Sequence, residues 1–190
     1  MNPFERLGLE YRLTFPEEGL ELRFQEIAKT THPDAGGSEA DFAWCRSAYE
    51  ELKSPGRRLK AAIKTLEIDG GERGSIPPEV VDHFGGVAEA LEAVERFLNE
   101  RSRARSGLAR ALQDSKVPEL KAGLELIQKD LALLEESFLS EFESFDHAGW
   151  CESAEKMGEV SRGLAFLEKW QGQIRAAMGN LFEALLGGAS

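Results

Sequence analysis

Apolar residues recur at every third or fourth position through most of this chain, and this spacing predicts helices. The clearest stretch alternates spacings of four and three: Leu120, Leu124, Ile127, Leu131, Leu134 and Phe138. Such a pattern places one apolar stripe on a helix that packs against partner helices. No stretch alternates apolar and polar residues over a useful length, as a half-buried strand would. The sequence therefore predicts an all-α protein.

Composition excludes several classes of function. The chain has 190 residues, 42% of them hydrophobic, and a formal net charge of −11. This acidity argues against a general affinity for nucleic acid or anionic lipid, since both need basic patches. No apolar run approaches a membrane span, and the first residues, MNPFERLGLE, show no secretion signal. Cys45 and Cys151 form no CxxC pair, so we expect no zinc site and a reduced, cytoplasmic protein.

The stretch DGGERGSIPP, residues 69–78, is rich in glycine and proline and predicts a linker. It would separate one domain over residues 1–68 from a second over residues 79–190. The charges divide in the same way, because residues 1–66 carry a net charge of −1 and the remainder a net charge of −10. We expect the acidic residues of the second domain to lie on solvated helix faces.

Three or four short helices are predicted before residue 67. Thr14 and Glu17 have the spacing of a capping box, in which each side chain bonds a backbone amide at the helix start. The helix they would begin ends before His32 and Pro33, because the residue before a proline disfavours helical geometry. A second amphipathic helix through residues 42–52 and a short one over residues 57–66 complete this region.

Three longer helices are predicted in the second domain. The first begins at Pro77-Pro78, and its apolar pattern continues past the basic stretch ERSRARS to Leu108 and Leu112. The second carries the stripe described above. The third begins with Asp146 as its cap, and together the three predict a helical bundle.

No constellation of catalytic residues is evident. His32 is a candidate general base, but a base needs an orienting partner and a shielded pocket, and neither is recognisable. No GxSxG, P-loop or HExxH motif is present. Cys45 lies on the apolar face of its helix, and Trp150 and Trp170 have the character of core or interface anchors. We therefore expect the protein not to be an enzyme.

The stretch THPDAGG, residues 31–37, fits a binding loop better. Pro33 restricts the backbone, His32 offers a ring with donor and acceptor nitrogens, and Asp34 offers a carboxylate suited to an arginine on a partner. From these three residues alone, an ordinary turn remains the stronger interpretation.

The surrounding sequence changes that balance. NPFERLGL, then LRFQEIAKTTHPD, then SEADFAWCRSAYEELKSPGRR resembles a J-domain over residues 2 to about 66. The resemblance implies a helical hairpin with HPD at its tip, which docks on a DnaK-type chaperone and stimulates its ATP hydrolysis. It implies chaperone contacts at His32, Pro33 and Asp34, with Arg23 and Lys29 on the preceding helix.

The rest of the chain is similar to the HscB family of iron–sulfur cluster assembly co-chaperones. AYEELKSPGRRLKAAI and FDHAGWCESAEKMGEVSRGLAFLEKW carry this similarity. It implies a J-domain followed by a C-terminal three-helix bundle that binds the iron–sulfur scaffold protein. The J-domain would deliver that scaffold to the specialised chaperone HscA. No metal or nucleotide is expected on this chain itself.

Two departures from the family pattern keep alternatives open. The helix over residues 17–31 holds four glutamates against Arg23 and Lys29, where J-domains usually present a basic face. The resemblance implies that the stretch after the linker, PPEVVDHFGGVAEALE, binds the client, but here its apolar pattern is interrupted by a charge and two glycines. Its candidate contact residues are Val80, Val81, Phe84 and Val87, although such residues are more often bundle core. The alternatives are a J-domain protein with another client and a structural adaptor with a degenerate J-like domain.

Overall fold

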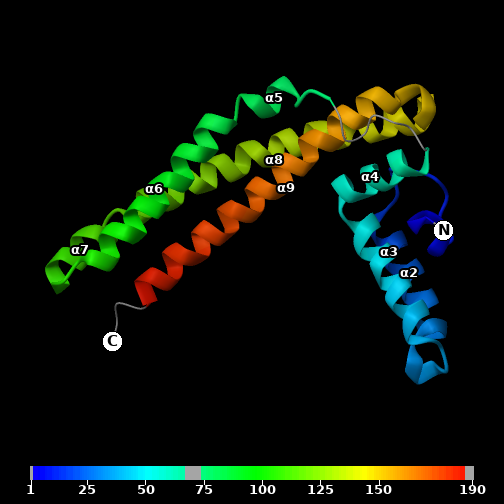
Figure 1. The fold of residues 1–190 in the computed structure, drawn as a ribbon, viewed down its shortest axis with the longest axis horizontal. Helices are drawn as coiled ribbons and strands as arrows, with labels where there is room; N and C mark the ends of the chain where they lie inside the picture. The colour runs from blue at the N-terminus through cyan, green and yellow to red at the C-terminus, as the bar shows by residue number, and fades with distance from the viewer. Residues whose placement is uncertain (1, 67–73, 187–190) are drawn as a thin grey trace. The chain divides into compact units, whose positions relative to one another are not determined.

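The computed structural model describes residues 2–66 and 74–186, and within these ranges it contains helices and no strand. In chain order the elements are α1 (Pro3–Arg6), α2 (Glu17–Thr31), the 3-10 helix η1 (Pro33–Ala35), α3 (Glu39–Lys53), α4 (Pro55–Thr65), α5 (Pro78–Val81), α6 (Phe84–Arg103), α7 (Gly107–Asp114), α8 (Val117–Ala148) and α9 (Trp150–Leu186) (Figure 1). The all-α prediction is confirmed.

The chain forms two compact units. The first comprises residues 1–77 and 137–165, and the second comprises residues 78–136 and 166–190. The ends of α8 and α9 that adjoin their connecting turn therefore belong with the N-terminal helices. The predicted linker, residues 69–78, lies partly outside the described residues, and the predicted boundary stays a prediction.

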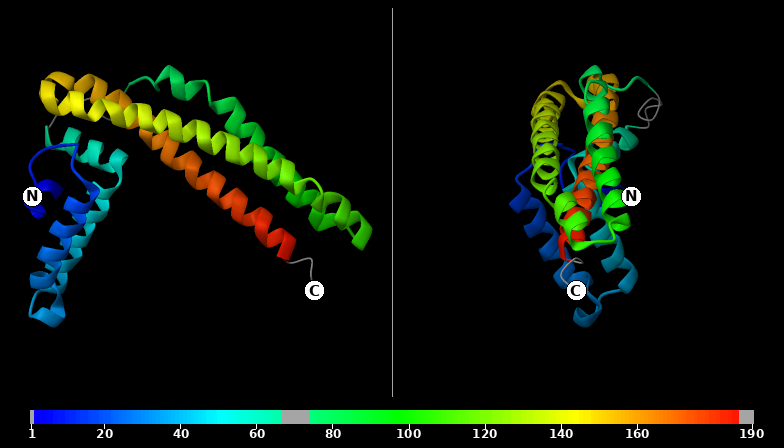
Figure 2. Two further views of the ribbon diagram at one scale, coloured as in Figure 1. Left: turned by 180° about the vertical axis from the view of Figure 1, so that it is seen from behind. Right: turned by 90° about the vertical axis from the view of Figure 1, so that its left-hand side faces the viewer.

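In the first unit, α2 and α3 form an antiparallel hairpin whose tip is η1 (Figures 1 and 2). The ends of the two helices follow the sequence signals closely. α2 ends at Thr31, directly before His32-Pro33, as predicted. Ser54 closes α3 and also caps α4, because its Oγ accepts a hydrogen bond from the backbone N–H of Arg57 at 3.4 Å.

The core of the hairpin is built from the helical apolar positions of the sequence. Phe24 of α2 and Tyr49 of α3 stack with ring centroids 4.4 Å apart. The fully or nearly fully buried side chains of α1 to α4 and their connections include Phe4, Leu7, Leu13, Leu20, Cys45, Ala48, Leu52, Leu59 and Ala62. Burial raises the pKa of the Cys45 thiol, which agrees with its predicted place in the core.

The predicted capping box at Thr14 and Glu17 is wrong. Pro16 is the N-cap of α2 and makes no side-chain capping bond. The Thr14 hydroxyl instead donates to Asp146 Oδ2 at 2.6 Å, across more than a hundred residues of chain. A long-range acceptor competes with the local cap, and spacing along the sequence cannot reveal it.

The prediction that Asp146 caps the last helix is wrong as well. Asp146 lies inside α8, which continues to Ala148, and the break before α9 is Gly149 with φ +92°. Its carboxylate accepts from the backbone N–H groups of Leu13 and Thr14, each at 2.9 Å, and from the indole N–H of Trp150 at 3.0 Å. Together with the Thr14 hydroxyl, these donors define the Asp146 joint.

Aromatic packing surrounds the Asp146 joint. Phe4 and Tyr11 lie 5.6 Å and 6.0 Å from the Trp150 ring, measured between centroids. Partial burial raises the pKa of Asp146, but the hydrogen bonds from Thr14, Leu13 and Trp150 together bring that pKa below its usual value. The segment before α2 is therefore fixed to the α8–α9 turn within the first unit.

In the second unit, α6, α8 and α9 supply the three helices of a bundle, as the sequence predicts. Its core is made by Val80, Val87, Val94, Phe97, Val117, Leu124, Leu131, Leu167, Trp170, Ile174, Ala177 and Leu181. No helix in the described ranges is both long enough and apolar enough to cross a membrane.

The continuous helix expected from Pro77 to Leu112 is wrong. It is broken before Phe84 and again at Ala104, whose backbone is extended, so that α5, α6 and α7 replace it. Ser106 caps α7, because its Oγ accepts from the Ala109 N–H at 3.1 Å. Serine competes well for backbone donors, and a helix start is therefore favoured here over continuation.

Candidate functional site

The tip of the hairpin is a short hydrogen-bonded turn that starts at His32. The His32 carbonyl accepts from the N–H groups of Ala35 at 2.9 Å and Gly37 at 3.0 Å, and the Pro33 carbonyl accepts from Gly36 at 3.0 Å. Pro33 is the first residue of η1, where its missing N–H leaves no bond unmade. These bonds fix the backbone of HPD, and each of them joins residues at most five positions apart.

Both glycines after HPD have a structural reason. Gly36 adopts φ +84°, in the left-handed region where a side chain is strained. A Cβ on Gly37 would overlap the carbonyl oxygen of Thr31, so this position needs a residue without a side chain. The Gly-Gly pair thus allows the chain to turn back tightly from α2 into α3.

The His32 ring is held in one orientation. Its Nδ1 accepts a hydrogen bond from the Asp34 backbone N–H at 3.2 Å, and its ring lies edge-on to Phe42 with centroids 4.8 Å apart. An accepting Nδ1 places the proton of the neutral ring on Nε2. The 3.5 Å distance from Nδ1 to Asp34 Oδ2 becomes an ion pair only when the ring is protonated.

Asp34 points into solvent. Its side chain is 92% exposed, and Pro33 beside it is exposed too. The tip therefore offers a ring N–H donor and a carboxylate acceptor on a rigid backbone, which can bind a partner with complementary groups. Within residues 2–66 and 74–186, no group of histidine, cysteine, aspartate and glutamate side chains could hold a metal ion.

The two basic residues predicted on α2 are placed differently. Arg23 Nε donates to the Leu7 carbonyl at 3.0 Å, and Arg23 Nη1 pairs with Glu26 at 3.0 Å. Arg23 thus holds the turn that contains Gly8, whose φ is +59°. The Lys29 side chain is exposed and makes no hydrogen bond or ion pair with the described residues. Of these two, Lys29 is the one that presents its charge freely beside the tip.

The four client-binding candidates of the second unit fall into two pairs. Val80 and Val87 are buried in the core, with 0% and 3% of their surface exposed. Val81 and Phe84 are 50% and 39% exposed. Two of the four residues can therefore meet a partner, and the other two belong to the core.

The structure adds two residues that sequence reasoning did not assign to this patch. The Phe84 ring packs against Phe166 and Trp170 of α9, with centroids 5.3 Å and 4.8 Å apart and steep interplanar angles. We call Val81, Phe84, Phe166 and Trp170 the aromatic patch. In the sequence, the four-residue spacing of Phe166 and Trp170 places both rings on one face of a helix. That spacing does not show which segment of the chain packs against this face.

Comparison with known proteins defines the fold. No model of a protein family matches the chain, and no curated protein sequence matches it. The structure of the chaperone HscB from Vibrio cholerae matches with a TM-score of 0.63, covering 95% of this chain and 99% of that chain. The chain has the HscB fold. The sequences are 21% identical, so the HscB likeness is one of architecture: a helical hairpin joined to a three-helix bundle.

Proposed function

We propose that this protein is a co-chaperone that stimulates the ATPase of a DnaK- or HscA-type chaperone through His32, Pro33 and Asp34. The observation that carries the proposal is the exposed, internally hydrogen-bonded tip of the hairpin, with the Asp34 side chain 92% exposed. The HscB fold supports it, because the same architecture occurs in a chaperone-system protein. We expect a cytoplasmic location.

The chain itself would perform no chemistry. A rigid tip loses little conformational entropy when it docks, so its polar groups contribute to binding efficiently. Asp34 suits an arginine of the chaperone, and the Nε2–H of His32 suits a carbonyl or carboxylate. Docking would favour the hydrolysis-competent state of the chaperone, which is a population shift and no catalytic step on this chain.

The replacement His32→Gln tests this proposal. Stimulation of steady-state ATP hydrolysis should disappear, while the free energy of unfolding should change by no more than about 1 kcal/mol, since the His32 ring packs against only one other ring, that of Phe42. His147→Gln is the matched control, because His147 is a 78% exposed histidine of α8. Normal stimulation by His32→Gln would remove the tip from the mechanism. If the unmodified protein stimulates no DnaK-type chaperone, the protein is better explained as a structural adaptor.

The aromatic patch is our candidate for the client-binding surface, with the iron–sulfur scaffold protein as the client. Half-exposed Phe84 lies beside the buried Trp170 ring. Val81 is half-exposed too, and its sequence neighbours Glu79 and Asp82 are exposed. A small apolar surface with a polar rim suits a transient protein partner. The HscB fold favours the scaffold over other clients.

Calorimetric titration with a purified iron–sulfur scaffold protein tests the client. The variant Val81→Ser/Phe84→Ala should bind at least about tenfold more weakly. The control is Leu126→Ser/Leu133→Ser, which changes two exposed leucines of α8, 61% and 56% exposed. If the unmodified protein does not bind the scaffold but still stimulates the chaperone, it is a J-domain protein with a different client.

A further inference from the structure

The end of α6, the connection that follows it and α7 together carry a net positive charge, whereas the rest of the C-terminal part is acidic. Residues 101–116 carry five basic side chains and one acidic side chain. The chain after residue 66 nonetheless has a net charge of −10. We call residues 101–116 the basic corner.

Two leucines of the basic corner face solvent. Leu108 is 74% exposed and Leu112 is 63% exposed. They are four residues apart on α7, so they occupy one face of that helix, one turn from each other. Single exposed leucines need no explanation, but two on one face of a helix form a small apolar surface. Arginines lie close to it in sequence, at positions 103, 105 and 110.

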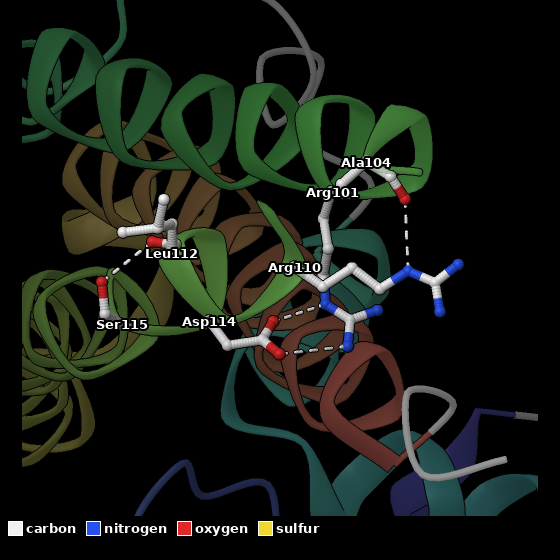
Figure 3. A network of polar contacts seen from close by, with 6 residues as sticks. All are labelled: Arg101, Ala104, Arg110, Leu112, Asp114 and Ser115. Atoms are coloured by element: carbon white, nitrogen blue, oxygen red, sulfur yellow. Dashed lines mark hydrogen bonds and ion pairs between the residues drawn. The ribbon is translucent and has the colours of Figure 1, made fainter. Parts of the chain in front are cut away.

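Other contacts hold the basic corner in place. Arg101 donates two hydrogen bonds to the Asp114 carboxylate, from Nε to Oδ1 at 2.6 Å and from Nη2 to Oδ2 at 3.4 Å. The Arg110 Nε donates to the Ala104 carbonyl at 3.2 Å (Figure 3). Lys116 pairs with Glu100 at 3.1 Å. These contacts brace α7 against α6, and the exposed faces of Leu108 and Leu112 are not needed for them.

The positive charge that remains is substantial. Arg101 and Lys116 are neutralised by their partners, but Arg103, Arg105 and Arg110 have no carboxylate of the described residues within ion-pair distance. All three are exposed. They can form bidentate bonds with carboxylates outside this chain.

We propose that the basic corner docks an acidic, amphipathic segment of a protein partner. Apolar side chains of that segment would cover Leu108 and Leu112, and its carboxylates would meet Arg103, Arg105 and Arg110. Charge complementarity identifies this occupant. An anionic membrane or a nucleic acid would approach with a broad negative surface, which the acidic remainder of the chain repels. A short segment meets only the corner itself. The basic corner shares no residue with the hairpin tip or with the aromatic patch.

Binding of a labelled synthetic probe to the full chain tests the proposal. The probe is a helical peptide with leucines on one face and glutamates beside them. A second peptide of the same composition, with its leucines spread around the helix, is the comparison. The first peptide should bind more tightly, and its affinity should fall as salt is raised.

Paired variants assign the binding to the basic corner. Leu108→Ser/Leu112→Ser and Arg103→Gln/Arg105→Gln/Arg110→Gln should each weaken binding by about tenfold. The matched controls are Leu126→Ser/Leu133→Ser and Lys129→Gln/Lys169→Gln/Arg175→Gln, which remove exposed side chains of the same kinds elsewhere in the second unit. These controls should bind as the unmodified protein does.

Several results would overturn the proposal. One is peptide affinity that is equal in the corner variants and in the controls, and another is no binding of the acidic peptide. A third is corner-dependent binding of phosphatidylserine vesicles or single-stranded RNA without binding of the peptide, which would assign the corner to a different class of partner. A fourth is corner-dependent self-association in sedimentation without peptide binding, which would make the occupant a second copy of this chain.

Discussion

Two aspartates of the first unit show how differently one side chain can be used. Asp34 stands at the tip of the hairpin with its carboxylate almost fully exposed, and the bonds around it join residues at most five positions apart. Asp146 is partly buried and accepts bonds from Leu13 and Thr14, more than 130 residues away in sequence, and from Trp150. The tip is ordered locally, whereas the Asp146 joint is ordered by tertiary structure.

This difference has a practical consequence for assigning function. A carboxylate with several internal donors serves the fold, because its replacement leaves those donors without an acceptor. A carboxylate on a rigid turn without such donors is available to a partner. The same contrast separates Arg23, which holds the Leu7 carbonyl, from Lys29, which is exposed.

The sharpest test of the contrast replaces each aspartate in turn. Asp146→Ala should lower the free energy of unfolding by about 3 kcal/mol, since several donors lose a charged acceptor. Asp34→Ala should lower it by less than about 0.5 kcal/mol. Urea denaturation of both variants measures the difference. Equal losses would mean that the Asp34 carboxylate contributes to the stability of the fold just as much as the Asp146 carboxylate does.

Gly37→Ala should lower the free energy of unfolding by about 2 kcal/mol, because the new Cβ overlaps the Thr31 carbonyl and the turn must open. Gly19→Ala is the control: it lies inside α2 with no atom within 4 Å of the new Cβ. The control should stabilise the protein by about 0.5–1 kcal/mol, since alanine favours the helix. Thermal unfolding of both variants, monitored by circular dichroism, is the measurement. A harmless Gly37→Ala would show that the local bonds do not hold the tip.

Thr14→Val should lower the free energy of unfolding by about 1 kcal/mol. The change keeps the shape of the side chain and removes only the hydroxyl bond to Asp146. In the Asp146→Ala background the same change should cost less, because its acceptor is already absent. A double-mutant cycle by urea denaturation measures this coupling, and strictly additive losses would contradict the proposed bond.

The smallest effect concerns pH. Because the folded-state pKa of Asp146 is lowered, its ionisation stabilises the fold above the unfolded-state pKa, near 3.8, and this contribution is lost as pH falls through the folded pKa. The stability difference between the unmodified protein and Asp146→Asn should therefore be constant near neutral pH and narrow below about pH 4. Denaturation at several pH values measures it. A difference that widens on acidification would mean that the pKa is raised instead.

Sequence reasoning succeeded where the signal is local. The end of α2 before His32-Pro33 follows from proline geometry, and the burial of Cys45 follows from helical periodicity. It failed at Thr14 and at Asp146, whose acceptor and donors come from distant segments. It also could not separate Val80 from Val81, because burial depends on how α5 packs and not on residue type.

For the exposed sites too, the sequence showed the features that depend on neighbouring residues, and the tertiary structure showed the rest. The motif HPD and its two glycines were visible in the sequence, and only the reason for Gly37, the closeness of Thr31, needed coordinates. The aromatic patch needed tertiary structure, since Phe84 meets Phe166 and Trp170 across about eighty residues of chain. Leu108 and Leu112 continued the apolar pattern of α6 in sequence, yet the break at Ala104 leaves them in solvent.

By itself, the sequence determined the helical class, the hairpin and its tip, because helix periodicity, proline and glycine act through neighbouring residues. Tertiary structure alone decided which polar groups hold the molecule together and which are left for partners. That choice depends on burial and on donors from remote segments. A carboxylate such as Asp146 becomes structural only when the folded chain brings Leu13, Thr14 and Trp150 to it.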